Sequence, residues 1–110
     1  MKWEIEYTTD ADRDLEEIDS YIADVLLEPA IAEKQVARLM DAAGGLNHLP
    51  FRHRIYDREP WRSKGIRVFP VNNYLILYFP NESRTVVEIV RILYGGRDIE
   101  AQLNQTEQSE

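Results

Sequence analysis

The stretch IRVFPVNNYLILYFPNESRTVVEIVRIL, residues 66–93, decides the fold, because it holds three β-strand patterns divided by two turns. The first two patterns, residues 66–71 and 74–79, flank the dipeptide Asn-Asn, which predicts a hairpin turn since asparagine tolerates positive φ. The polar segment PNES predicts the second turn. Residues 85–93 are almost continuously hydrophobic, which predicts a central strand covered on at least one face.

Upstream of this stretch the pattern changes from strand to helix. Residues 2–7 alternate hydrophobic and charged side chains, which predicts a strand with one apolar and one charged face. Thr8-Thr9-Asp10 offers helix N-caps, and hydrophobic residues then recur at three- and four-residue steps up to Leu26, which predicts an amphipathic helix of about 16 residues. Pro29 suits the first position of a second helix, which Gly44-Gly45 weakens near its end.

These elements predict an α+β fold with the order β-α-α-β-β-β. Two helices joined by a few residues pair antiparallel, and the simplest way to bury both is to pack this hairpin on one face of a mainly antiparallel sheet. The opposite face is then expected to be free for function. We expect a single domain over residues 1–103, a short helix near residues 99–103, and a flexible tail over residues 104–110.

Composition narrows the class of protein. With 110 residues and 44% hydrophobic content, the chain has enough material for one core. The absence of cysteine excludes disulfides and thiolate chemistry, and suits a reducing compartment. The longest apolar run is too short to span a bilayer, and no signal-peptide pattern is visible at the start. We therefore expect a soluble cytoplasmic protein that does not enter the membrane.

The net charge of −7 is unevenly spread. Residues 1–50 hold 4 Lys/Arg against 12 Asp/Glu, a balance of −8, whereas residues 51–110 hold 9 against 8, a balance of +1. Within the second half, the segment from Arg52 to Arg67 is locally basic. An acidic molecule is repelled by phosphate backbones at long range, so composition alone does not favour a nucleic-acid binder.

Three segments, with a leucine shortly after the last of them, together resemble toxins of the RelE/ParE superfamily, which belong to type II toxin–antitoxin systems. They are ADRDLEEIDSYI at residues 11–22, GIRVFPVNNYLILYF at 65–79 and VVEIVRILYGGRD at 86–98, and the resemblance extends from residue 5 to 103. It implies a toxin that a cognate antitoxin neutralises by wrapping around it. In this superfamily the RelE-like branch cleaves messenger RNA in the ribosome without a metal, and the ParE-like branch poisons DNA gyrase.

The strand at residues 74–79 separates the two branches. RelE-like toxins typically carry an arginine after its first tyrosine, where this chain has Leu75. Leucine does not stabilise the charge of a phosphorane, and Leu77 and Phe79 would share its face of the strand. The chain is therefore more similar to the ParE-like branch. We expect Leu75, Leu77 and Phe79 to form an exposed apolar face on which the antitoxin docks.

A nuclease would need cations and a proton donor. The catalytic candidates of these kinds are Arg67, Arg91, Tyr94 and Arg97. Structural alternatives stand beside each of them. Arg91 is explained as well by an ion pair with an acidic neighbour, either Glu88 or a carboxylate of the N-terminal half. Arg97 would form a surface pair with Asp98, and Tyr94 would be an aromatic that packs at an edge.

The predicted loop over residues 51–65 interleaves basic and aromatic side chains. Four of them are candidates for contact with a target or nucleic acid: Arg54, Arg58, Trp61 and Arg62. In the alternative interpretation, Tyr56 and Trp61 cover the edge of the core while the arginines face the acidic helices. His48 and His53 lack an acidic cluster beside them, so we expect no metal site, and no motif predicts a cofactor.

The leading hypothesis is a ParE-like toxin that inhibits DNA gyrase by protein contact, arrests growth and serves plasmid stabilisation. Its partners would be gyrase and a cognate antitoxin, with operator DNA reached only through the antitoxin. A RelE-like mRNA interferase acting on the ribosome is the first alternative. The second is a degenerate toxin that only binds its antitoxin and regulates its operon.

Overall fold

The computed structural model describes residues 2–96, 99–104 and 106. Along the chain the elements are β1 (Glu4–Tyr7), α1 (Thr9–Ser20), a π-helical turn (Tyr21–Val25), α2 (Pro29–Gly44), a 3-10 turn (Gly45–Asn47), β2 (Arg67–Val71), β3 (Tyr74–Asn81), β4 (Val86–Tyr94) and α3 (Ile99–Asn104). This order confirms the predicted α+β fold with its helical hairpin and three consecutive strands. Pro29 begins α2, as its missing N–H favours.

Four strands form one mixed sheet in the order β1-β4-β3-β2. β1 runs parallel to β4, whereas the β2–β3 and β3–β4 pairs are antiparallel. The turn between β2 and β3 places Asn72 at φ 55°, the left-handed conformation that asparagine tolerates. β4 lies between two strands and is buried along most of its length, as its hydrophobic sequence predicts.

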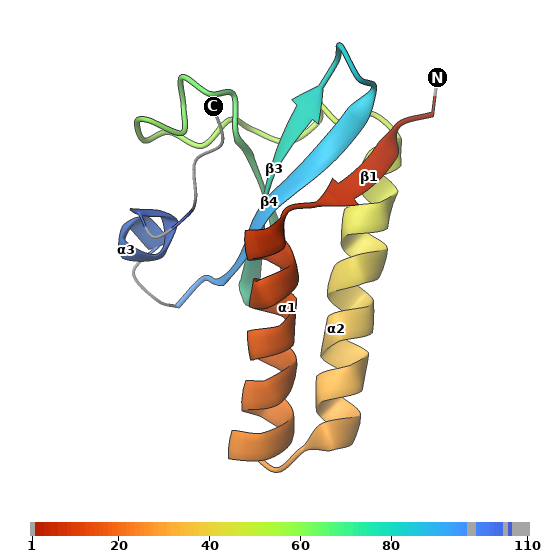
Figure 1. Ribbon diagram of the computed structural model, residues 1–110, viewed down its shortest axis with the longest axis vertical. Helices are drawn as coiled ribbons and strands as arrows, with labels where there is room; N and C mark the ends of the chain where they lie inside the picture. The colour runs from red at the N-terminus through yellow and green to blue at the C-terminus, as the bar shows by residue number, and fades with distance from the viewer. Residues whose placement is uncertain (1, 97–98, 105, 107–110) are drawn as a thin grey trace.

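The α1–α2 hairpin covers one face of the sheet (Figure 1). Alternate residues of the strands point toward the helices, so the core on this side combines both patterns. Its buried members are Ala11, Leu15, Leu39, Ala43, Leu46, Ile76, Tyr78, Val87, Ile89 and Ile92. The helices are longer than the sheet is tall, and the last turns of α1 and the first turns of α2 reach past the ends of the strands (Figure 1).

The opposite face of the sheet is covered, so the prediction that it is free for function is wrong. The segment between α2 and β2 and the short helix α3 pack on it and build a second core. Its buried members are Tyr56, Trp61, Ile66, Val68, Leu77, Leu93 and Leu103. The physical reason is that the leucines and aromatics of this face are too apolar to remain in water when the chain supplies its own cover.

The β2 edge of the sheet is partly protected from pairing with another chain. At the β2 edge the Val68 N–H donates to the Arg54 carbonyl at 3.0 Å, and Ile55 forms an isolated bridge with Arg67. Pro70 adds no N–H to this edge.

None of the described helices combines the length and the apolar character needed to cross a bilayer.

Candidate functional site

α1 takes the place of a strand beside the second half of β4. β1 ends where Tyr7 pairs with Ile89, and beyond this point α1 runs along the β4 edge. The Thr8 hydroxyl caps α1 by accepting from the Ala11 N–H at 3.1 Å, and it donates to the Val90 carbonyl at 2.9 Å. One side chain therefore starts the helix and satisfies a backbone group of the sheet edge.

Asp14, one turn further along α1, joins the same edge to Arg91. Its carboxylate accepts from the Ile92 N–H at 2.9 Å, and from Nε and Nη2 of Arg91 at 2.7 and 2.8 Å. The remaining nitrogen of the guanidinium, Nη1, donates to the Gln102 carbonyl at 2.7 Å and to the Thr106 hydroxyl at 2.8 Å. Arg91 thus links α1, β4 and the C-terminal segment.

This arrangement matches the structural alternative for Arg91, with a carboxylate of the N-terminal half as its partner. Both side chains are about nine-tenths buried, and hydrogen bonding to Asp14 raises the pKa of the guanidinium above its ordinary value. All three guanidinium nitrogens already donate to protein groups. A catalytic role would require this buried bidentate pair to open, which is energetically expensive.

The other candidate catalytic residues lie apart from Arg91. Arg67 projects on the helix side of the sheet, where its Nη1 donates to the carbonyls of Phe51 and His53 at 3.2 and 2.7 Å. Arg91 is paired in register with Leu77, a residue of the opposite core, so the two arginines point to opposite faces. Tyr94 is 45% exposed at the end of β4, 5.6 Å from the Tyr74 ring, and Arg97 lies outside the described residues.

The basic segment is divided between anchoring aromatics and exposed arginines. Trp61 is only 5% exposed, which leaves little of its ring on which a base could stack. It covers the second core together with Tyr56, as the alternative interpretation held. Arg54, Arg58 and Arg62 are exposed, and Arg58 pairs with Glu100 of α3 at 2.9 Å.

The predicted docking face on β3 is only partly accessible. Leu77 is fully buried beneath the segment between α2 and β2, which we call the covering segment. The prediction that Leu77 is exposed is therefore wrong. Leu75 and Phe79 are half-buried at the margin of the second core. The sequence could show that these side chains share a face, but not that an aperiodic segment would cover it.

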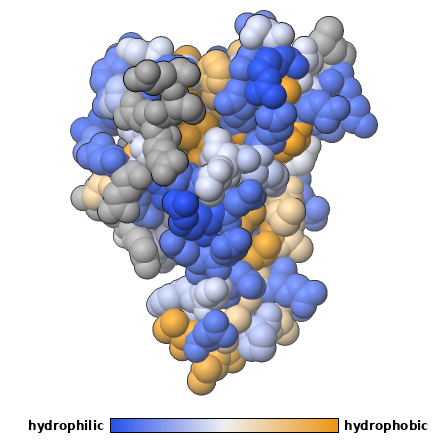
Figure 2. Space-filling view, viewed as in Figure 1, coloured by the Kyte–Doolittle hydropathy of each residue, from blue (hydrophilic) through white to orange (hydrophobic). Residues whose placement is uncertain are grey.

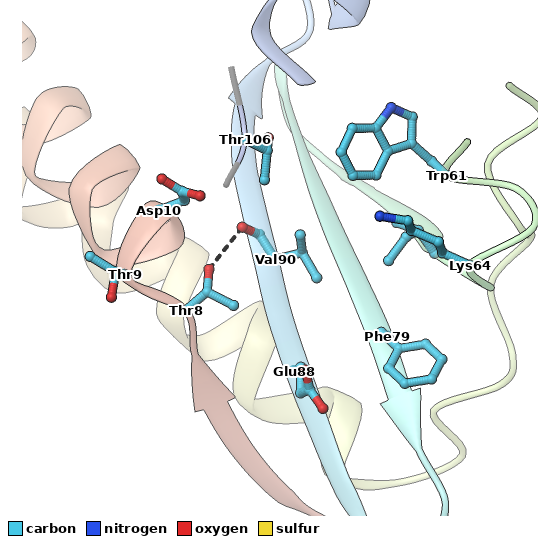
Figure 3. A pocket seen from close by; sticks show the side chains of 10 residues that line it. Thr8, Thr9, Asp10, Trp61, Lys64, Phe79, Glu88, Val90 and Thr106 are labelled. Carbon is cyan, nitrogen blue, oxygen red and sulfur yellow. Dashed lines mark hydrogen bonds between the residues drawn. The ribbon is translucent and has the colours of Figure 1, made fainter. Parts of the chain in front are cut away.

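Two hollows flank the covering segment. The first, of about 330 Å³, lies between the start of α1, the outer face of β4 and the basic segment, and Figure 3 shows Trp61 and Lys64 facing Thr8 and Glu88 across it. Its walls carry charges of both signs, together with the aromatic ring of Phe79. The second hollow, of about 500 Å³, is more apolar and is lined by Trp3, His48, Leu49, Pro50, Phe51 and Arg52.

A different feature, absent from the sequence-based predictions, stands at the far end of the helical hairpin. Figure 2 shows a cluster of hydrophobic side chains there, on the part of the hairpin that reaches past the sheet. We call this cluster the tip patch. Its members are Tyr21, Val25, Leu26, Leu27 and Ile31, which are between 49% and 76% exposed. Helical periodicity alone counts several of these residues toward the core.

Comparisons with known proteins agree on the type of fold. The family model described as the ParE toxin of the type II toxin–antitoxin system parDE matches residues 5–99. Among solved structures, the "Chromosomal ParDE TA system from P. aeruginosa" is similar with a TM-score of 0.71 and 18% identity, covering 84% of this chain and 96% of that one. At this identity the likeness concerns the fold alone.

A second solved structure, the toxin–antitoxin complex RelBE2 from Mycobacterium tuberculosis, is similar with a TM-score of 0.63 and 25% identity. The match covers 86% of this chain and 99% of that one. Comparison with curated proteins gives no match.

Proposed function

The chain belongs to the family of ParE toxins of type II toxin–antitoxin systems, and from this premise we propose that it inhibits DNA gyrase by direct protein contact. The observation that carries the proposal is the separation of the candidate catalytic groups. Arg67 and Arg91 lie on opposite faces of the sheet, and each donates to groups of its own chain. General acid–base cleavage of RNA needs such groups within hydrogen-bond reach of one phosphate.

A supercoiling assay with purified gyrase tests this proposal. We expect the toxin to inhibit supercoiling in proportion to its concentration. The Arg91→Lys variant should still inhibit, to an extent set by the fraction of the variant that is folded. No inhibition at a large excess of folded toxin would contradict the proposal. Toeprinting on translating ribosomes examines the RelE-like alternative, since message cut at the ribosomal A site would favour it.

We propose further that a cognate antitoxin neutralises the toxin in the cytoplasm, and that operator DNA is contacted through the antitoxin. The support is the family itself, together with two solved relatives described as a toxin–antitoxin system and a toxin–antitoxin complex. Leu75 and Phe79 remain the candidate contacts on β3, because they lie at the margin of the covered face.

The antitoxin contact is tested by Leu75→Lys, which places a charge at a half-buried position and should weaken antitoxin binding. Leu77→Asp does not serve this purpose, since a charge at a fully buried site would unfold the toxin and abolish binding indirectly. An exposed substitution, Ser83→Lys, is the matched control. Equal affinity of Leu75→Lys and Ser83→Lys would show that the antitoxin docks elsewhere.

A further inference from the structure

The tip patch gathers five large apolar side chains on a part of the hairpin that the sheet cannot cover. Leu27 is 76% exposed and Val25 64%, the highest values among the large exposed hydrophobic residues of the described chain. In Figure 2 the patch forms the lower end of the molecule, and Figure 1 places it beyond the last residues of the strands. Contiguous exposed apolar surface of this kind is typical of interaction sites.

The backbone of the tip carries two irregularities. Residues Tyr21–Val25 form a π-helical turn. Such turns are rare in proteins, and those that occur are often found at functional sites. Leu27 follows at φ 57°, a left-handed conformation in which a branched side chain is unfavourable. Glycine or asparagine would satisfy this connection with less strain. The left-handed turn itself closes the end of the helix, since the Glu28 N–H donates to the Ile22 carbonyl at 3.0 Å. This cap does not require a large apolar side chain that is 76% exposed.

Acidic side chains predominate around the patch, and the exposed Lys34, one turn after Ile31 on α2, is the nearest basic side chain in the sequence. No Lys or Arg occurs between Arg13 and Lys34, while six acidic side chains of this stretch are exposed to solvent. They are Glu16, Glu17, Asp19, Asp24, Glu28 and Glu33. The partner of an apolar surface with an acidic rim should carry apolar side chains flanked by basic ones. Two copies of the tip would bring like charges together, which disfavours a symmetric dimer through this surface.

We propose that the tip patch is a docking surface for a basic amphipathic helix of a partner protein. Such a helix presents an apolar stripe to the aliphatic side chains, and its flanking Lys and Arg side chains reach the acidic rim. The proposal rests on the geometry and charge of the hairpin, and it stands whether or not gyrase is the target.

Synthetic helical peptides of about 18 residues test the charge and the pattern of the partner. The probe carries Leu at every third and fourth position and Lys elsewhere, one control replaces Lys by Glu, and another scrambles the order. Titration of the full-length chain with the Leu/Lys probe should shift the backbone NMR signals of residues 21–31. Equal binding of the scrambled or acidic peptide would overturn the proposal, as would signal changes confined to other surfaces.

A pair of variants separates apolar docking from general attraction between opposite charges. The double variant Val25→Ser, Leu27→Ser keeps every charge and should weaken binding of the Leu/Lys probe by about tenfold or more, which corresponds to 1.4 kcal/mol. Met40→Ser removes an apolar side chain that is 48% exposed further along α2 and should leave the dissociation constant unchanged. Equal affinities for both, with circular dichroism showing intact folds, would contradict the proposal.

Self-association is measured on the chain alone by sedimentation equilibrium. A monomer, with or without the Val25→Ser, Leu27→Ser substitutions, agrees with a patch meant for another protein. Oligomers that form in the natural chain and vanish in the double variant would show that a second copy occupies the patch, and would overturn the choice of partner.

Discussion

At the scale of single residues, the strongest constraint on the described structure is the bidentate pair between Asp14 and Arg91. Substitution Asp14→Ala would leave the guanidinium buried without its counter-charge and the Ile92 N–H without its acceptor. We expect a loss of about 3–5 kcal/mol in the free energy of unfolding, as is typical when one partner of a buried pair is removed. Urea denaturation followed by circular dichroism measures this loss.

Two controls accompany that prediction. Glu16→Ala changes an exposed carboxylate on the same helix and should alter stability by no more than about 0.5 kcal/mol. The double variant Asp14→Leu, Arg91→Met removes both charges and should recover part of the loss, because no buried charge is left unpaired, while the Ile92 N–H still lacks its acceptor. Equal effects of Asp14→Ala and Glu16→Ala would mean that the ion pair contributes little.

Substitution of Leu27 by glycine is expected to increase stability, in contrast to Asp14→Ala. Its φ of 57° is one that glycine adopts without strain, so Leu27→Gly should stabilise the fold by about 1 kcal/mol. The neighbouring Leu26 has φ −86°, and Leu26→Gly should instead destabilise by about 0.5–1 kcal/mol through the entropy of the unfolded chain. Thermal unfolding distinguishes the two. A destabilised Leu27→Gly would show that this leucine serves the monomer, which would remove one support of the docking proposal.

His53 predicts how stability depends on pH. Its ring stacks on Phe69 at 4.1 Å, and burial together with the nearby Arg52 lowers its pKa below the ordinary value of 6.5. The unfolded chain therefore binds the proton more readily than the folded one, and stability should fall as pH drops below about 6.5. The loss levels off once pH passes below the lowered pKa.

Urea midpoints between pH 5 and 8 measure this dependence. His53→Phe keeps the aromatic contact and should flatten the curve near pH 6. A curve that keeps its slope in His53→Phe would assign the proton uptake to other groups.

At the scale of elements, Thr8 both caps α1, as the sequence suggested, and connects this helix to β4. Thr8→Ala removes both the cap of α1 and the hydroxyl donor to the Val90 carbonyl on β4. We expect a loss of about 1–2 kcal/mol in the free energy of unfolding, at the upper end of the range for caps. Thr9→Ala, at the exposed first position of the helix, is the matched control and should have little effect. Similar losses in both would argue against Thr8 as the cap.

Periodicity predicted the elements because each of them has a regular pattern of buried side chains. The hairpin of helices, the three consecutive strands and the position of Pro29 all follow from such patterns. The segment at residues 51–65 has no period, so its sequence could not show that Tyr56 and Trp61 would cover the second face of the sheet. A pattern also identifies which side chains share a face, but not what lies opposite them.

The partner of Arg91 illustrates the same limit for the candidate site. The sequence allowed Glu88 or a carboxylate of the N-terminal half, and only the fold brings Asp14, 77 positions away, against the guanidinium. The exposed tip was missed for a related reason. Hydrophobic spacing is the same whether a helix turn lies over the sheet or extends past it, and the length of the helices relative to the strands decides between the two (Figure 1).

At the scale of the whole molecule, one sheet separates two cores of unequal construction. The core on the helix side is closed by two long helices, whereas the second is closed by an aperiodic segment and by α3, a helix of 6 residues. A helix this short is not stable by itself in water. Its attachment depends on Leu103, which is fully buried, on the contact of Arg91 with the Gln102 carbonyl, and on the pair between Arg58 and Glu100.

This asymmetry predicts that the second core opens before the first. Leu103→Ala should remove about 2–5 kcal/mol of packing from α3, and hydrogen exchange of amides in residues 99–104 and 54–66 should accelerate far more than in β4. Leu39→Ala, an equally buried leucine of the helix-side core, should instead lower the protection of the whole sheet and shift the global transition. If both variants accelerate exchange uniformly, the two cores unfold as one unit. Separate opening would mean that the segment between α2 and β2 and α3 can detach while the helical hairpin still holds the strands. The apolar face of β3, with Leu77 at its centre, would then become accessible without loss of the fold.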